Sequence, residues 1–176
     1  MRFLNLLFLA PLAIAAPLQK RATAQEVNND VTGIDTAVRQ LTAAVEAYQG
    51  GIEESSPVFD AALAVHAINR KGFADANAAP RFTSEESRII VENVMNSVGV
   101  SIPAGVEVIK AKKPLFDEAQ LSSLVKATID LLKFDHETFS LAVGAKLSPD
   151  QIVPGAAAAG KIDLVLQGAS LFYTLP

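Results

Sequence analysis

The feature that most constrains the fold is the spacing of apolar residues near the start of the chain. This spacing alternates between four and three residues and includes Val27, Val31, Ile34, Val38, Leu41, Val45 and Tyr48. It places the side chains on one side of an α-helix and does not fit a strand, whose side chains alternate between two faces. Gly50-Gly51 follows directly, as expected where a helix ends. The segment therefore predicts one long helix with an apolar side that packs against other helices.

The middle of the chain carries two further helix starts. Ser56-Pro57, a capping hydroxyl followed by proline, predicts a second helix that ends near Gly72. Thr83 with Glu86 three residues later has the spacing of a capping box and predicts the start of a third helix. We expect glycine 99 and proline 103 to break this helix, leaving a short helical piece over residues 104–112.

The last part of the chain continues the helical spacing. A fourth helix is predicted over residues 117–145, a loop over 149–155 and a final helix over 156–173. No segment shows the sustained alternation of a strand, and alanine and leucine are frequent. The predicted fold is therefore all-α, an up-and-down helical bundle of four long helices plus one or two short ones.

The first residues have the layout of a secretory signal peptide. Arg2 precedes an apolar run that ends at Ala15 and is well short of the ~20 residues that a membrane anchor, the alternative, would need. The small residues at the end of this run favour cleavage after residue 15, with residue 16 as the other option. Lys20-Arg21 is either a propeptide cleavage site or an ordinary exposed basic pair. We predict a signal peptide over 1–15, a short propeptide over 16–21 and a single helical-bundle domain over 22–176.

The charge of the mature chain excludes some partners. The two cuts remove three of the 15 basic residues and none of the 19 acidic ones, so twelve remain against nineteen and the net charge changes from −4 to −7. This charge argues against nucleic acid or an anionic membrane as a partner. The chain has no cysteine, but a chain of this length can bury a sufficient core without disulfides. We expect no transmembrane segment in the mature protein, and a secreted, extracellular location with at most a loose association with the cell wall.

The residues that carry most enzyme chemistry are missing or poorly spaced. His136 lies between Asp135 and Glu137, but adjacent residues point apart on a helix and make a poor metal site. Residues 155–161 have the glycine and lysine spacing of a phosphate loop, yet Ile162 stands where serine or threonine is required. A Ser-His-Asp triad assembled from distant residues stays open as an alternative. We expect no enzymatic activity, no metal and no cofactor.

Several motifs are spread over most of the chain. They are the signal peptide with Lys20-Arg21, the helix end Val45-Glu46-Ala47-Tyr48-Gln49-Gly50-Gly51, the junction Lys112-Lys113-Pro114-Leu115-Phe116, the leucine-rich stretch that reaches Phe139 and the last helix. On these residues the chain resembles the hydrophobic surface-binding protein A family, also called the fungal antigenic cell-wall galactomannoproteins. The resemblance implies a helical bundle that encloses fatty acids such as arachidonate, or that adsorbs to hydrophobic surfaces and recruits secreted polyesterases.

The apolar stripes fit either a solid core or the wall of a cavity. They are rich in valine, alanine and isoleucine and poor in large aromatic residues, and the resemblance favours the cavity. We therefore predict that the protein is secreted and encloses a long-chain fatty acid in an apolar cavity between its helices. The alternative is an adsorber that coats waxes or polyesters and recruits secreted hydrolases.

Candidate contacts with the ligand follow from the stripes. The residues expected to line the cavity are Leu41, Val45, Leu63, Val94, Leu124, Leu131 and Leu166. Polar side chains on or beside an inward stripe need a partner, which could be another side chain, a water molecule or a ligand head group. On this basis Ser97 and Thr128 are the candidate contacts with the head group of the acid.

Overall fold

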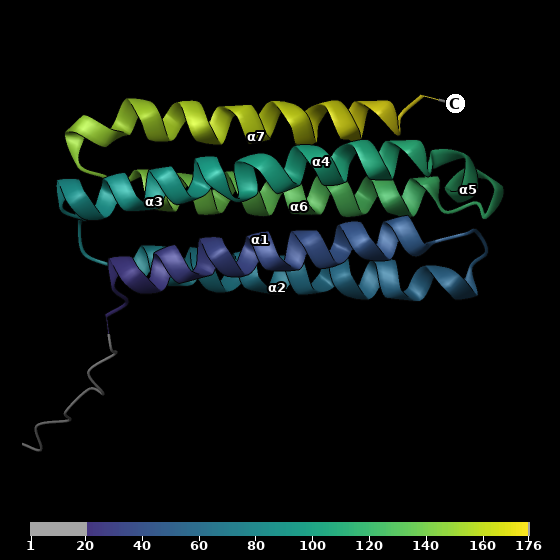
Figure 1. Ribbon diagram of the computed structural model, residues 1–176, viewed down its shortest axis with the longest axis horizontal. Coiled ribbons are helices and arrows are strands. Elements are labelled where there is room, and N and C mark those ends of the chain that lie inside the picture. The colour runs from purple at the N-terminus through teal and green to yellow at the C-terminus, as the bar shows by residue number, and fades with distance from the viewer. Residues whose placement is uncertain (1–20, 176) are drawn as a thin grey trace, which may run out of the picture.

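The computed structural model describes residues 21–175, which form a bundle of helices that run along one axis (Figure 1). The four longest helices are α1 (Ala24–Ala47), α2 (Ser56–Ala78), α6 (Ser122–Gly144) and α7 (Ile152–Phe172). Helices α3 (Ser84–Asn96) and α4 (Val98–Ala111) lie end to end, and the short α5 (Lys113–Glu118) leads from α4 to α6. Two 3-10 helices, η1 (Glu53–Ser55) and η2 (Pro149–Gln151), precede α2 and α7. Residues 21–175 contain no strand, and the predicted all-α bundle is confirmed.

The N-terminal helix begins close to the basic pair. The predicted signal peptide over 1–15, and the predicted propeptide over 16–21 apart from Arg21, lie outside the described residues. Arg21 is exposed, whereas Ala22 is buried. Thr23 then caps α1 through a capping box, in which the Glu26 amide donates to Thr23 Oγ1 at 3.1 Å and the Thr23 amide donates to the Glu26 carboxylate at 2.8 Å. Among the described residues, the helical bundle therefore starts within a few residues of Arg21.

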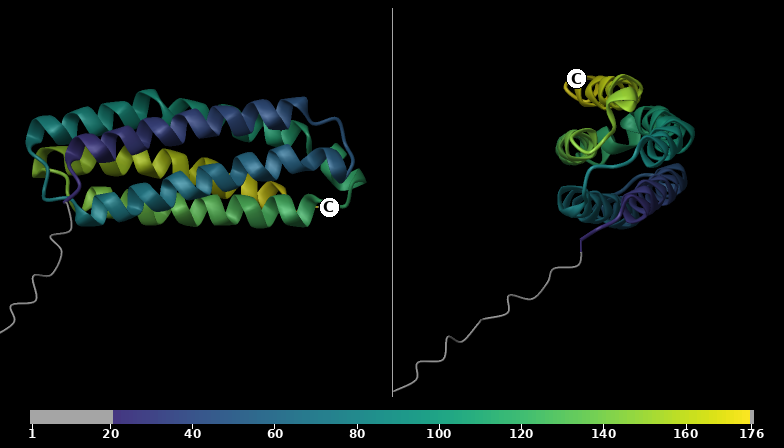
Figure 2. Two further views of the ribbon diagram at one scale, coloured as in Figure 1. Left: turned by 90° about the horizontal axis from the view of Figure 1, so that it is seen from below. Right: turned by 90° about the vertical axis from the view of Figure 1, so that its left-hand side faces the viewer.

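The long helices form a closed ring around the bundle axis. Helix α1 contacts α2, α2 contacts α6, α6 contacts α7, α7 contacts α4, and α4 contacts α1. The end-on view of Figure 2 shows this arrangement, with α3 and α4 together forming one side of the ring. Four closely packed helices fill their common axis with side chains, whereas a ring of five rods leaves more space at its centre. The ring therefore provides room for a cavity along the axis.

The break between α3 and α4 differs from the prediction. It lies at Ser97, whose φ of −113° and ψ of −92° are not helical, and not at Gly99 and Pro103. Pro103 falls inside α4, where its missing N–H removes one backbone hydrogen bond without ending the helix. Because α4 restarts directly after Ser97, α3 and α4 act as one long rod rather than as a helix with a short appendage.

Other helix ends show where local signals hold and where packing overrides them. The predicted capping box of Thr83 is confirmed. The predicted end of α1 before Gly50-Gly51 is also confirmed, and both glycines have a positive φ. In contrast, α2 continues through Gly72 to Ala78. A Cβ at Gly72 would lie 2.9 Å from the ring of Phe139 in α6, so this glycine allows a close approach of two helices rather than ending one.

The last two long helices also differ from the prediction: α6 is shorter than expected and α7 is longer. The predicted fourth helix is interrupted after α5, because Gln120 adopts a positive φ of 59° before α6 starts. The final helix starts earlier than predicted and includes Pro154 and Gly155. Proline is tolerated there because the first-turn amides of a helix have no intrahelical partner.

Candidate ligand-binding cavity

A cavity of about 420 Å³ lies among the helices of the ring. Its volume is within the usual range of small-molecule sites, roughly 300–1,000 Å³. One side of every long rod contributes to its wall, for example Val38 of α1, Val65 of α2, Ile102 of α4, Ile129 of α6 and Ile162 of α7. Because these side chains are mostly branched aliphatic residues, the wall offers dispersion contacts and few hydrogen bonds.

The stretch that forms α3 and α4 owes its apolar character to this wall. By length and composition, Ser84–Ala111 is the one helical stretch among residues 21–175 that could cross a membrane, but core helices meet the same criterion. Its wall residues are Ile90, Val91, Val94, Val98, Ile102, Gly105, Val106 and Ile109. Contact with the cavity therefore accounts for these residues, whereas Ile89, Met95 and Val100 of the same segment are exposed.

Most polar side chains in the wall are satisfied by their own helix. Thr42 Oγ1 donates to the carbonyl of Val38 at 2.9 Å, and Asn69 Nδ2 donates to the carbonyl of Val65 at 3.0 Å. Thr128 Oγ1 likewise donates to a backbone carbonyl of α6, one turn earlier, at 2.9 Å. The hydroxyl hydrogens of Thr42 and Thr128 and one amide hydrogen of Asn69 are therefore engaged in local bonds, which makes this part of the wall less polar than its side chains alone would suggest.

His136 and Ser140 form a polar pair in the cavity wall. Nε2 of His136 lies 3.1 Å from the carbonyl oxygen of Ala159 in α7, and Nδ1 lies 3.3 Å from Ser140 Oγ, one turn later in α6. A carbonyl oxygen can only accept, so Nε2 carries the proton, and Nδ1 of the neutral ring accepts from the Ser140 hydroxyl. Burial lowers the pKa of the His136 imidazole below its ordinary value, which favours this neutral form.

The mouth of the cavity lies between the end of α6 and the start of α7. The wall there includes residues that are exposed to solvent: Leu141 and Gly144 of α6, Ala145 directly after it, and Ile152 and Ala156 of α7. Ser140 is one turn from Gly144, and His136 is one turn further inside. The polar pair therefore lies one to two helical turns inside the opening, and the cavity extends further beyond it.

The residues predicted to line the cavity separate into two groups. Leu41, Val45, Val94 and Leu166 are in its wall, and so is Thr128. The remaining three point to solvent and are not in this wall: Leu63 is 62% exposed, Leu124 is 49% exposed and Leu131 is 41% exposed. Ser97 also lies outside the wall, and its hydroxyl donates to the carbonyl of Asn93 at 2.6 Å.

The difference arises because apolar residues cover more than one side of α2 and α6. In α6 the inward positions include Val125 and Leu132. Val125 directly follows the exposed Leu124, and Leu132 directly follows the exposed Leu131. Neighbouring positions on a helix are separated by about 100°, so a leucine beside an inward residue can be largely exposed. His136 and Ser140 carry no such apolar signal, although their spacing of four residues places them on one face.

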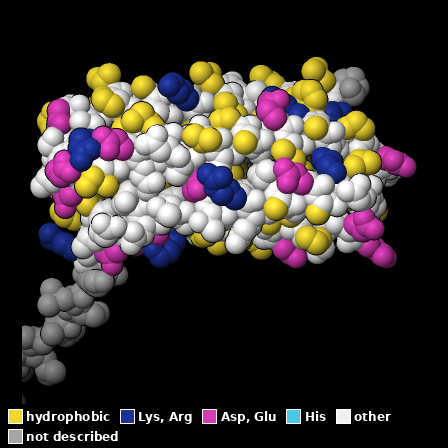
Figure 3. Space-filling view, in the orientation of Figure 1, with side chains coloured by type: hydrophobic (Ala, Val, Ile, Leu, Met, Phe, Trp, Pro, Cys, Tyr) yellow, Lys and Arg dark blue, Asp and Glu magenta, His cyan; other side chains and the backbone are white. Residues whose placement is uncertain are grey.

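Exposed apolar side chains form a stripe along α7. Val153, Leu164 and Leu171 are 77%, 70% and 60% exposed. Their separations of 11 and seven residues place them on one side of the helix. Figure 3 shows hydrophobic side chains along the edge of the molecule that α7 forms in Figure 1. The outer side of α7 is therefore unusually apolar for a surface exposed to water.

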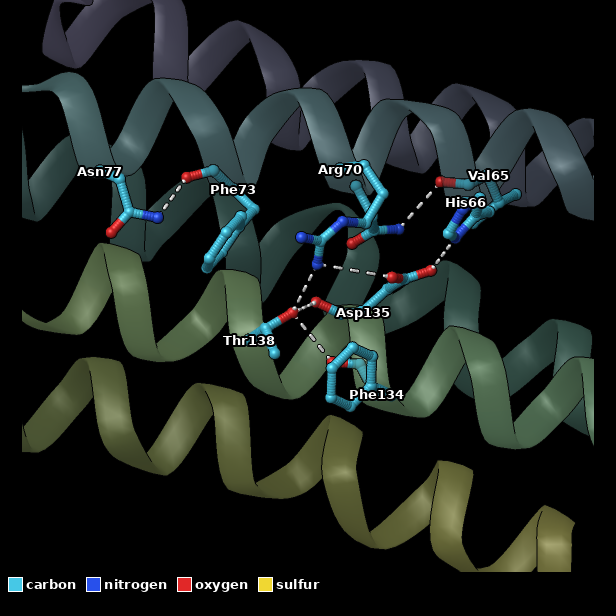
Figure 4. Close-up of polar contacts among 9 residues, drawn as sticks. Val65, His66, Arg70, Phe73, Asn77, Phe134, Asp135 and Thr138 are labelled. Atoms are coloured by element: carbon cyan, nitrogen blue, oxygen red, sulfur yellow. Dashed lines mark hydrogen bonds and ion pairs between the residues drawn. The ribbon is translucent and has the colours of Figure 1, made fainter.

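A second polar cluster joins α2 to α6 outside the cavity wall (Figure 4). The Asp135 side chain is fully buried, with Oδ2 2.6 Å from His66 Nδ1 and Oδ1 3.8 Å from Arg70 Nη1. Arg70 Nη1 also donates to Thr138 Oγ1 at 3.2 Å. The buried carboxylate of Asp135 therefore contacts side chains of α2 rather than groups in the cavity, and only its Oδ2 has a hydrogen-bond partner. Among residues 21–175, no group of acidic or histidine side chains is placed to hold a metal ion.

Comparison with known proteins places these features in context. The model of a family described as "Hydrophobic surface binding protein A" matches residues 24–145. A search of curated proteins finds no match.

Several solved structures share the fold. Afmp4p in complex with palmitic acid is 20% identical with a TM-score of 0.82, over 85% of this chain and 99% of that one. Ligand-binding domain 1 of the Penicillium marneffei MP1 protein with arachidonic acids is 19% identical with a TM-score of 0.80, over 85% and 98%. Domain 2 of the same protein with multiple arachidonic acids is 16% identical with a TM-score of 0.78, over 86% and 94%. At these identities the likeness shows a common fold.

Proposed function

Because this chain belongs to the hydrophobic surface binding protein A family, we propose that it is a lipid-binding protein that encloses a long-chain fatty acid in the cavity between its helices. The observation that carries the proposal is the cavity of about 420 Å³ with its largely apolar wall. Three structures with the same fold hold palmitic or arachidonic acid, which supports a fatty acid as the ligand of this chain also.

The size of the hydrophobic effect is sufficient for useful affinity. Burying a chain of about sixteen carbons contributes on the order of 12 kcal/mol, at ~0.8 kcal/mol for each methylene. Association and ordering of the ligand remove about 4 kcal/mol at the least, which leaves about 8 kcal/mol and a Kd that is roughly micromolar at best. An apolar wall without a strong hydrogen-bond pattern favours chain length over chain identity, so we expect several long-chain acids to bind.

Native mass spectrometry of protein purified from its own secretions tests this function. The expected result is a species heavier than the polypeptide by the mass of a fatty acid, which organic extraction removes. Titration of the extracted protein with palmitic acid should then saturate. Absence of a bound lipid together with absence of saturable binding would refute the proposed function.

We also propose that the protein is not an enzyme. His136 and Ser140 are an imidazole and a hydroxyl in contact, which is the pair that nucleophilic catalysis uses. However, Nε2 of His136 bonds to the backbone carbonyl of Ala159, where a catalytic triad would have a carboxylate. Incubation with p-nitrophenyl esters should therefore release no more p-nitrophenol than the same protein with Ser140→Ala.

The location that we propose is extracellular, after removal of the predicted signal peptide and propeptide. Exposure of Arg21 next to the buried Ala22 is consistent with a processing site at the edge of the folded bundle. N-terminal sequencing of the secreted protein should start at Ala22. A start at residue 16 or 17 would exclude the second cut.

Adsorption to hydrophobic surfaces is a second candidate, and the exposed stripe of α7 favours it. Val153, Leu164 and Leu171 would contact a wax or polyester, to which secreted hydrolases could then be recruited. Replacing these three residues by serine should reduce adsorption to a polyester film in a quartz crystal microbalance. Binding of palmitic acid should be unchanged, because none of the three belongs to the cavity wall. Equal adsorption of the variant and the wild type would refute this role of the stripe.

A further inference from the structure

One titratable side chain, His136, faces the cavity among the described residues of its wall. Aspartate, glutamate, lysine and arginine are absent from that wall, so a carboxylate that enters has no permanent cation to pair with. An ionised carboxylate without a partner is strongly disfavoured in an apolar site. A fatty acid must therefore leave its head group in water at the mouth, or become neutral inside as part of a pair.

We propose that His136 and Ser140 are the head-group site, and that a fatty acid binds there together with one proton. This inference rests on the proposed function of the cavity. The proton lies between the carboxyl group and Nδ1 of His136, so the acid and the imidazole together are neutral. The Ser140 hydroxyl, which donates to Nδ1 without ligand, turns to donate to the other carboxyl oxygen. Nε2 keeps its bond to the carbonyl of Ala159.

The position of the pair suits a ligand that enters with its tail first. His136 is eight residues from Gly144 at the mouth, which is ~12 Å along a helix. In the other direction, the wall of α6 continues to Val125 for eleven residues, or ~16 Å. The only polar wall group of α6 in that part is Thr128, whose hydroxyl already donates to the carbonyl of Leu124. The tail thus has an apolar path beyond the head group.

Charges around His136 do not replace the ligand as its partner. Those that act on it are Asp163 in α7 and Lys133 and Glu137 in α6. Lys133 pairs with Glu137 and lies 3.4 Å from Asp163, so the three groups together carry one net negative charge and leave no free cation for the carboxylate of a ligand.

The other helices packed against α6 present their charges elsewhere. Helix α2 places His66 and Arg70 against Asp135, which is adjacent to His136 and points away from it by about 100°. Helix α5 places Asp117 beside Ser122, at the opposite end of α6 and ~20 Å along the helix from His136.

A proton taken up on binding makes the affinity depend on pH. Above about pH 5 a free carboxylic acid is ionised, and the lowered pKa of His136 leaves the free imidazole neutral at pH 7 and above. The complex then holds one proton more than its separate components. Linkage requires the affinity to fall about tenfold for each pH unit in this range, and to level off below the pKa of free His136.

The test compares dodecanoic acid with 1-dodecanol, which has the same chain and no ionisable group. Calorimetric titrations of the extracted protein between pH 6.5 and 8.5 measure how the affinity depends on pH. Titrations at pH 7.5 in two buffers of different ionisation enthalpy measure the number of protons taken up on binding. For the acid we expect about a tenfold loss of affinity per pH unit and uptake of about one proton. For the alcohol we expect neither.

Three variants and one matched control assign the proton. His136→Gln should abolish the pH dependence for the acid and leave the alcohol affinity within about threefold. Ser140→Ala should keep the pH dependence but weaken the acid roughly fivefold, as expected for one lost hydrogen bond. The matched control is Ser97→Ala, which removes a hydroxyl outside the cavity wall and should change neither property. Thr128→Val tests the other hydroxyl of the α6 wall and should keep the pH dependence. Circular dichroism of each variant establishes that the helices are intact.

Each outcome has a definite meaning. A pH-dependent acid affinity that disappears in His136→Gln supports the inference. An acid affinity independent of pH, or a dependence that survives His136→Gln, overturns it and places the head group in water or at another residue. If Thr128→Val weakens the acid and Ser140→Ala does not, the head-group site is at Thr128 and the inference is wrong. If neither the acid nor the alcohol binds, the proposed function fails and this inference fails with it.

Discussion

Replacing Ala62 by phenylalanine distinguishes a ligand cavity from a solid core. Ala62 is 3% exposed and lies in the cavity wall on α2. The matched control is Ala169→Phe in α7, because Ala169 is 0% exposed and lies outside the wall. Both substitutions add the same ring to a buried alanine, but only the first ring has empty space to enter.

The two variants should differ in both stability and binding. A ring forced into a packed site costs about 1–3 kcal/mol, so Ala169→Phe should lower the melting temperature by about 2–12 °C. Ala62→Phe should lose less than about 1 kcal/mol, because its ring replaces a void. That ring occupies the space of about four methylenes of the ligand, worth ~0.8 kcal/mol each, or about 3 kcal/mol in total. The affinity for palmitic acid should therefore fall roughly 100-fold.

Thermal melting followed by circular dichroism and calorimetric titration with palmitic acid measure the two effects. The reasoning is refuted if Ala62→Phe melts as low as Ala169→Phe, because the site would then be part of a packed core. It is also refuted if Ala62→Phe keeps its stability and its full affinity, since the ligand would then bind elsewhere.

Three further substitutions test the account of the fold by urea unfolding. Gly72→Ala should destabilise the protein by about 1–2 kcal/mol, because its Cβ would lie 2.9 Å from the ring of Phe139. Gly168→Ala, whose Cβ would have no atom within 4 Å, should instead stabilise it by about 0.5–1 kcal/mol. Equal effects of the two variants would contradict the close approach of α2 and α6. His66→Ala should lower the free energy of unfolding by about 3 kcal/mol, because it removes a main partner of the buried Asp135 carboxylate. Adding Asp135→Asn to this variant should recover part of the lost stability. No recovery would show that the loss comes from packing. Thr83→Ala should cost about 1 kcal/mol through loss of the cap of α3, and a neutral result would mean that the cap contributes nothing.

The apolar pattern of the sequence predicts only some of the residues in the cavity wall. Leu41 and Val45 belong to a single narrow stripe on α1, and both lie in the cavity wall. In α6 the apolar residues cover a wider arc, and Leu124 and Leu131 fall on its solvent side. A pattern along one helix gives the angle between residues but not the direction of the bundle axis. That direction depends on which helices pack on either side, and for α6 these are α2 and α7.

The polar residues of the site were harder to identify. A hydroxyl near an apolar stripe needs a partner, which makes Ser97 and Thr128 candidates, but each finds that partner in a backbone carbonyl four residues earlier. In the sequence, His136 between Asp135 and Glu137 shows only the poor geometry of a metal site. Its place in the cavity depends on contact with Ala159 of α7, a residue 23 positions later. The spacing of His136 and Ser140 was the one local signal that could have identified the pair.

The sequence by itself determined the helices, because apolar spacing, caps and glycines act within a few residues of one another. It thereby determined the all-α bundle, the capping box at Thr83 and the apolar character of what the helices enclose. Only the tertiary structure decided that α3 and α4 form one rod of a closed ring, and that the ring leaves a cavity of about 420 Å³. The physical reason is that a cavity is a property of the distance between helices. That distance is set by the packing of side chains from segments far apart in the chain, such as Gly72 of α2 against Phe139 of α6.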